Sequence, residues 1–116
     1  MAEIIDRSAI VTLSDSVGEE FVGELIDTFV DEAPGLFQNM RQAQLAGDAD
    51  RFRRAAHSLK SNASTFGAIR LAELAKELES MARANDLNTG NRLEALEEEY
   101  RKAVAALQSL NESLQE

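Results

Sequence analysis

The sequence contains no cysteine and no tryptophan, a single proline and a single histidine. The lack of cysteine excludes disulfides and thiol chemistry. No apolar run approaches the roughly 20 residues that a membrane-spanning helix needs. The N-terminus also lacks a basic region followed by an apolar stretch, which is the pattern of a secretory signal. We therefore expect a soluble, cytoplasmic protein that makes no use of a membrane.

Positive charge is scarce as well. The chain has 12 Lys and Arg residues against 21 Asp and Glu residues, which gives a formal net charge of −9. A chain this acidic binds polyanions poorly, so nucleic acid is not an expected partner. Against this background, the cluster of Arg51, Arg53, Arg54 and Lys60 is a local exception.

What the sequence does contain is a helical pattern of apolar residues. With 116 residues, 44% of them hydrophobic, it is long enough for one domain spanning residues 1–116. Apolar residues recur at helical spacing over 18–46, 48–67, 68–84 and 92–116, and no strand pattern occurs. Four long amphipathic helices with short connections predict an antiparallel up-down four-helix bundle. Because four helices complete such a bundle, we expect a monomer.

Several residues predict where the helices begin and end. Asp6 is a candidate cap for a short accessory helix that covers one end of the bundle. Ser16 and Glu19 match a capping box and predict the start of the first long helix. Pro34 lies inside that helix and is expected to bend it without breaking it. Gly67 is a predicted left-handed stop after the helix that contains His57.

His57 is the residue with the clearest chemical potential. At about 100° per residue, it points away from the apolar stripe of its own helix, which predicts a ring in water. The same outward face carries small and cationic side chains: Arg53, Arg54, Lys60, Ser61 and Ser64. Nearby cations disfavour the imidazolium and would stabilise negative charge delivered to a neutral, nucleophilic ring. A surface histidine with no role is the competing interpretation of the same pattern.

Other kinds of chemistry find little support. There is no phosphate-binding glycine loop, and one histidine without cysteine does not make an ordinary zinc site. The inward-facing Glu-x-x-His pattern of di-iron bundles is also missing. The acidic run around Glu97 is expected to be a solvated surface. We therefore expect no metal centre and no cofactor.

The residues around His57 resemble the signature of histidine-containing phosphotransfer (HPt) domains. The resemblance lies in His57-Ser58-Leu59-Lys60-Ser61-Asn62-Ala63, then Phe66-Gly67-Ala68, then Leu71, Leu74, Leu78 and Glu79, with upstream support from Leu13, Glu24-Leu25, Phe29 and Pro34. The usual family pattern is His-x-Leu-Lys-Gly with a second glycine after the turn. Ser61 replaces the first of these glycines with another small residue. The resemblance covers nearly the whole chain and implies a free-standing HPt protein.

The resemblance also implies a mechanism. By that likeness, His57 would accept a phosphoryl group from a receiver-domain aspartate on Nε2 and pass it to another receiver. Lys60 would meet a phosphoryl oxygen, and Glu79 would hydrogen-bond the other ring nitrogen. Ser61, Ser64, Arg53, Arg54 and Gly67 would belong to the docking or phosphoryl-stabilising surface. The partners would be response-regulator receivers or a hybrid histidine kinase. Mg²⁺ would be held by the receiver, so the protein would be a carrier and not an enzyme.

Three alternatives remain at this stage. A helical adaptor that binds a signalling partner without chemistry is compatible with the same bundle. The chain could also be the phosphoacceptor piece of a larger histidine kinase, which would use the same histidine. Glu79 is equally compatible with a solvated position at the edge of its helix.

Val30 and Phe37 lie at the margin of a buried stripe, where we expect them to extend an apolar docking rim.

Overall fold

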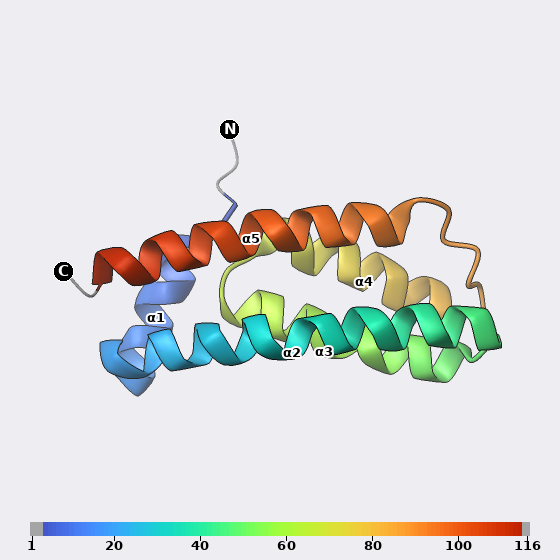
Figure 1. The fold of residues 1–116 in the computed structure, drawn as a ribbon, viewed down its shortest axis with the longest axis horizontal. Coiled ribbons are helices and arrows are strands. Elements are labelled where there is room, and N and C mark those ends of the chain that lie inside the picture. Colours follow the sequence, from blue (N-terminus) through green and yellow to red (C-terminus); the bar gives the residue numbers. More distant parts are fainter. Residues whose placement is uncertain (1–3, 115–116) are drawn as a thin grey trace.

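The structure, a computed structural model, describes the backbone of residues 4–114 and the side chains of residues 4–112. Within that range the chain forms helices and no strand. The helices are α1 (Arg7–Val17), α2 (Glu19–Ala46), α3 (Ala49–Thr65), α4 (Ile69–Arg83) and α5 (Arg92–Leu114), shown in Figure 1. The all-α fold class predicted from the sequence is confirmed.

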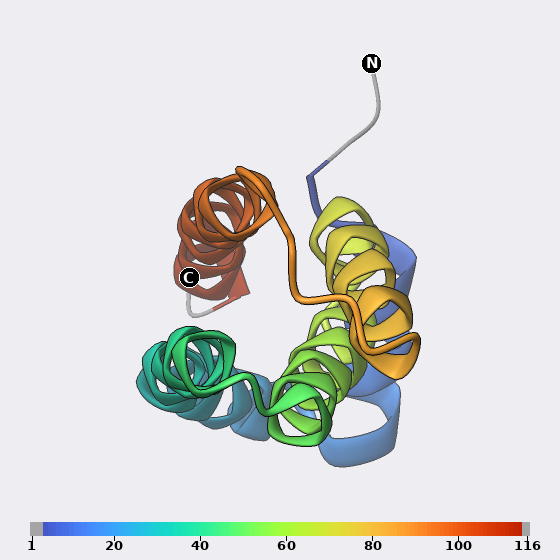
Figure 2. The same cartoon turned by 90° about the vertical axis from the view of Figure 1, so that its right-hand side faces the viewer.

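The four long helices form an antiparallel bundle in chain order. Each packs on the next, and α2 packs on α5 to close the ring, as the end-on view in Figure 2 shows. The apolar stripes meet along the axis, where Ile26, Phe52, Leu71 and Leu107 are almost completely buried. The up-down bundle expected from the helical spacing is therefore present, and α3 and α4 lie side by side along it.

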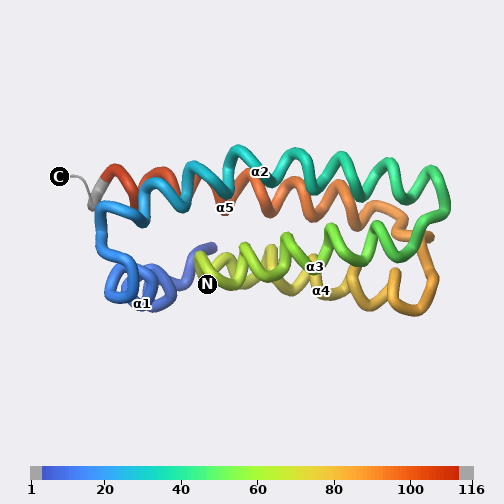
Figure 3. The backbone as a smooth tube through the Cα atoms, turned by 90° about the horizontal axis from the view of Figure 1, so that it is seen from below, coloured from blue at the N-terminus to red at the C-terminus, as the bar shows by residue number. Residues whose placement is uncertain are grey.

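The short helix α1 is accessory, as predicted, and lies across one end of the bundle (Figure 3). It begins at Asp6, whose carboxylate accepts a hydrogen bond from the Ser8 amide. The Asp6 amide donates to the Gly67 carbonyl over 2.8 Å. Gly67 has φ +71°, and a Cβ there would lie 2.6 Å from the Asp6 carbonyl oxygen. A glycine is therefore needed where α1 meets the α3–α4 turn.

The predicted capping box at Ser16 is wrong. Helix α1 continues through Ser16 to Val17, so this serine lies in the last turn of one helix and not at the start of the next. Gly18 separates the two helices with φ +89°, and α2 begins without a side-chain cap. Further along, Gly47 in the left-handed conformation ends α2, and Asp48 caps α3 by accepting from the Arg51 amide. Both boundaries lie at residue types that are favoured at helix ends.

Helix α2 runs unbroken through Pro34, which confirms one helix instead of two. Proline has no amide hydrogen, so the carbonyl one turn earlier, on Val30, loses its helical partner. The Tyr100 hydroxyl of α5 donates to this carbonyl over 3.2 Å. The Tyr100 ring also packs edge-on against Phe29 and Phe37. A side chain from α5 thus satisfies the acceptor that the proline leaves free.

Removing the Tyr100 hydroxyl tests this arrangement. We expect Tyr100→Phe to lower the free energy of unfolding by about 1 kcal/mol, because the Val30 carbonyl is left without a donor. In a Pro34→Ala background the new backbone amide supplies that donor, so the cost should fall by at least half. Urea unfolding of the four proteins measures both costs. An equal cost in the two backgrounds would contradict this account of the contact.

Candidate functional site

His57 lies in the middle of α3 on the face opposite the buried stripe. Its side chain is 55% exposed. The stripe itself is closed off from water, with Phe52, Ala56, Leu59 and Ala63 essentially inaccessible. The solvent-facing position expected from the helical spacing is therefore what the structure shows.

Glu79 of α4 is the residue that fixes the histidine ring. Its side chain is only 3% exposed, and its Oε2 lies 2.6 Å from Nδ1 of His57. Its second oxygen, Oε1, accepts from Nζ of Lys60, also over 2.6 Å. One buried carboxylate thus joins the ring and the lysine one turn away. Of the two positions left open by the sequence, the structure selects the buried one.

The charge state of Glu79 sets the tautomer of His57. The hydrogen bond from Lys60 holds the pKa of Glu79 below its ordinary value; burial opposes this, and His57 adds to the lowering. An ionised carboxylate can only accept hydrogen bonds, so Nδ1 must carry the proton. The lone pair of the neutral ring is then on Nε2, for which no hydrogen-bond partner is present among the described side chains.

The two arginines before His57 are less available than the sequence suggests. Nη2 of Arg53 lies 3.0 Å from one oxygen of Asp50, and Nε of Arg54 lies 3.1 Å from the other. The bond from Arg53 also lowers the pKa of Asp50. Arg51 instead reaches back to the side chains of Asn39 and Gln42 on α2. The structure thus offsets much of the predicted positive cluster with Asp50 and Glu79.

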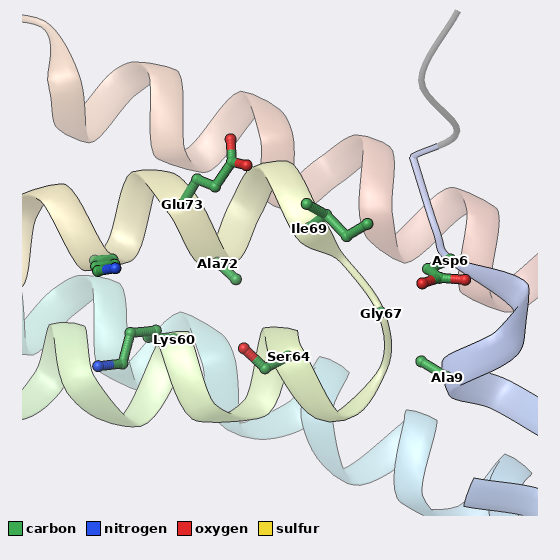
Figure 4. A pocket seen from close by; sticks show the side chains of 9 residues that line it. Asp6, Ala9, Lys60, Ser64, Gly67, Ile69, Ala72 and Glu73 are labelled. Carbon is green, nitrogen blue, oxygen red and sulfur yellow. The ribbon is translucent and has the colours of Figure 1, made fainter. Parts of the chain in front are cut away.

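Beyond His57, the same face continues into a shallow hollow between α3 and α4. Figure 4 shows this hollow, which has a volume of about 320 Å³ and includes Lys60, Ser64 and Gly67 in its lining. Ser61 and Ser64 are exposed, as expected. Gly67 is buried, and its carbonyl accepts from the Asp6 amide before α1, so it holds the turn beside this surface.

The apolar part of this face differs from the prediction. Phe37 is 5% exposed and packs on Tyr100, so it belongs to the core and not to a docking rim. Val30 is half-buried and packs on the same core. The exposed apolar side chain beside the hollow is Ile69, the first residue of α4, at 49% exposure. The apolar spacing did not predict an exposed position for Ile69, because this residue lies at the junction between the α3–α4 turn and the first turn of α4.

Comparison with known proteins identifies the family to which this fold belongs. The model of the Hpt domain family matches residues 24–115, which include the whole of α3 and α4. The chain belongs to the Hpt domain family. It is 33% identical over 87 residues to phosphorelay protein LuxU of Vibrio cholerae, covering 75% of this chain and 77% of that protein. It is 31% identical over 85 residues to LuxU of Vibrio harveyi, covering 73% and 75%.

A solved structure supports the same assignment. The crystal structure of histidine-containing phosphotransfer protein B (HptB) from Pseudomonas aeruginosa PAO1 superposes with a TM-score of 0.84 at 28% identity, over 97% of this chain and 98% of that one. This Hpt protein is therefore a phosphotransfer intermediate of two-component signalling, and its partners belong to the receivers and kinases of such systems.

Two further features of this Hpt domain bear on its chemistry. Among the residues that the structure describes, no three His, Asp or Glu side chains gather closely enough to hold a metal ion. None of the described helices is both long and apolar enough to cross a membrane. The groups that the structure brings together at the site are the His57 imidazole, the buried Glu79 carboxylate and the Lys60 ammonium.

Proposed function

We propose that His57 accepts a phosphoryl group on Nε2 from the aspartyl phosphate of one receiver domain and passes it to the aspartate of another. The observation that carries the proposal is the 2.6 Å contact between Nδ1 of His57 and buried Glu79. It holds the proton on Nδ1 and leaves Nε2 as the nucleophile on an exposed ring.

The proposed phosphoryl transfer forms one bond to phosphorus and breaks another. The Nε2 lone pair forms a bond to phosphorus while the bond from phosphorus to the aspartyl oxygen breaks, and that electron pair stays on the aspartate. The ring gains positive charge, which the Glu79 carboxylate stabilises through the Nδ1 proton. Onward transfer reverses these steps and returns a neutral imidazole. Catalysis then consists of positioning and electrostatics.

The remaining roles concern Lys60, the receiver domain and the oligomeric state. Lys60 Nζ, with three donors, is one turn from the ring and can meet a phosphoryl oxygen. The receiver would supply the aspartate and the Mg²⁺, so this protein acts as a carrier and not as an enzyme. We further propose that it works as a monomer in the cytoplasm, where receiver domains reach the exposed face of α3.

Phosphotransfer from a receiver tests the function directly. A receiver domain labelled with radioactive phosphate is mixed with the protein, which should acquire label that is labile in acid and stable in alkali, as a phosphoramidate is. Screening the receivers of the same organism would identify donors and acceptors. If no receiver transfers label, and a partner binds equally well whether or not the protein is phosphorylated and whether or not His57 is present, the adaptor hypothesis is favoured.

Ser61 provides a test of close docking. We expect Ser61→Arg to slow transfer from a receiver by tenfold or more, since misplacement of the reacting atoms by about 1 Å can cost on the order of 10²-fold. Loading from phosphoramidate, a donor small enough to avoid the arginine, should change little. Ser109→Arg on the exposed face of α5 is the matched control. Normal transfer by Ser61→Arg would refute the role of this position in docking.

A further inference from the structure

A second cation, besides Lys60, reaches the buried carboxylate of the site. Nη2 of Arg83 lies 3.5 Å from Oε2 of Glu79, the same oxygen that binds the His57 ring. Arg83 follows Glu79 by one turn of α4, and its side chain is 65% exposed against 29% for Lys60. The two cations therefore differ in how tightly they are held. Lys60 is half-buried and makes a short contact with Glu79, whereas the more exposed Arg83 makes a longer contact.

Resting on the function proposed above, we propose that Arg83 is a positioning residue that replaces Lys60 on Glu79 when His57 is phosphorylated. In the unphosphorylated protein, Lys60 is the main counter-ion of Glu79. In the phosphorylated protein, Lys60 turns to the phosphoryl oxygens and Arg83 closes on the carboxylate. Glu79 thus keeps a cation throughout, and its contact with Nδ1 of His57 is preserved in both states.

The charges at the site favour an exchange of this kind. A phosphoryl group adds roughly −1.5 to −2 charges near neutral pH and brings three acceptor oxygens. Lys60 lies one turn from the ring, so the new anion competes with Glu79 for it. When Lys60 turns to the phosphoryl group, a carboxylate that is only 3% exposed loses its lysine counter-ion and keeps only the Nδ1 contact of the ring, which is unfavourable for a buried charge. Arg83 already lies within range and has a side chain free to move.

Arg70 is a natural control for Arg83. Both are arginines of α4, both side chains are 65% exposed, and both pair with a glutamate of their own helix. The partner of Arg70 is Glu73, which is itself 64% exposed and has no contact with His57 among the described residues. A general effect of removing a positive charge from α4 should appear in both variants, whereas a specific effect on Glu79 should appear only for Arg83.

The first experiment follows the arginines directly. Wild-type protein is loaded with potassium phosphoramidate, whose P–N bond breaks as the bond to Nε2 forms and ammonia leaves. Exchange of the Arg83 guanidinium protons with water, measured by NMR, should slow on phosphorylation, while that of Arg70 stays the same. Unchanged exchange at Arg83 overturns the proposal. A wild-type protein that takes no phosphoryl group at all contradicts the proposed function, and this inference falls with it.

The second experiment measures the consequence. At equilibrium with a receiver, Arg83→Gln should hold about two- to fivefold less phosphoryl than wild type, a modest effect because the side chain is largely exposed. Arg70→Gln should match wild type, and Arg83→Lys should recover most of the loss. The Nδ1 proton resonance of the unphosphorylated protein should be unchanged in Arg83→Gln. Equal equilibria for Arg83→Gln and Arg70→Gln would refute the role of Arg83.

Discussion

Replacing His57 by glutamine is expected to abolish phosphoryl uptake from both a receiver and phosphoramidate. His57 is the only histidine in the sequence, so no second imidazole can take over its role. Its side chain is 55% exposed, and the variant should therefore stay folded, with a change in unfolding free energy of about 1 kcal/mol or less. Labelling and far-UV circular dichroism on the same sample measure the two effects.

The neighbouring Ser58 supplies the control. It is exposed on the same helix, and Ser58→Gln introduces the same side chain one residue along. This variant should accept a phosphoryl group from phosphoramidate at close to the wild-type rate. Acid-labile label that persists in His57→Gln would show that the phosphoryl group is carried elsewhere.

Removing the Glu79 carboxylate is expected to have the second-largest effect. Glu79→Leu deletes the group that holds Nδ1, so the ring is free to rotate and to change tautomer. We expect transfer to slow on the order of 10²-fold, the scale associated with loss of orientation at a reacting centre. The transfer rate of Glu79→Gln should lie between those of the wild type and Glu79→Leu, because the glutamine amide oxygen can accept from Nδ1 but carries no charge to stabilise the ring. Stopped-flow transfer rates and the ¹⁵N shifts of the ring measure this order.

Glu77 is the matched control for Glu79. It is a glutamate of the same helix, with its side chain 49% exposed and paired with Arg92 over 2.7 Å. Glu77→Leu should leave both the transfer rate and the tautomer as in the wild type. If Glu79→Leu transferred as fast as Glu77→Leu, the carboxylate would have no part in positioning the ring.

Glu79 should also be visible in the pH dependence of stability. Its pKa is lowered from an ordinary value of 4.5, so the folded state favours the ionised form. A carboxyl group with a depressed pKa contributes stability that is complete above its unfolded pKa and is lost as the pH falls through its folded pKa. As the pH falls below about 4.5, Glu79→Gln should therefore lose less stability than wild type. A parallel loss in urea unfolding would contradict the lowered pKa.

Much of the fold follows from local patterns. The apolar spacing of α3 and α4, the cap at Asp6 and the left-handed Gly67 are properties of short segments, and these predictions are confirmed. The exposure of His57 follows from the same spacing. Ser16 shows the limit of this reasoning, because its motif is satisfied in sequence while Gly18, two residues later, decides where the chain turns.

The site is harder to derive because its contacts join different helices. Glu79 meets His57 and Lys60 across the α3–α4 interface. The apolar spacing gives no sign of these partners, and only the family resemblance implied the contact with His57. The place of Glu79 four residues after buried Ala75 was the available signal of its burial. The pairing of Asp50 with Arg53 and Arg54 is local and could have been read from the i, i+3 and i, i+4 spacing. Phe37 turned inward because Tyr100, distant in sequence, covers it.

The atom that carries the phosphoryl group is the central claim, and NMR of the phosphorylated protein tests it most directly. With the histidine ring labelled with ¹⁵N, the ³¹P resonance should couple to Nε2 of His57, while Nδ1 keeps a proton hydrogen-bonded to Glu79. Coupling to Nδ1, or phosphorus on any other residue, would contradict the role of the buried carboxylate and the function built on it.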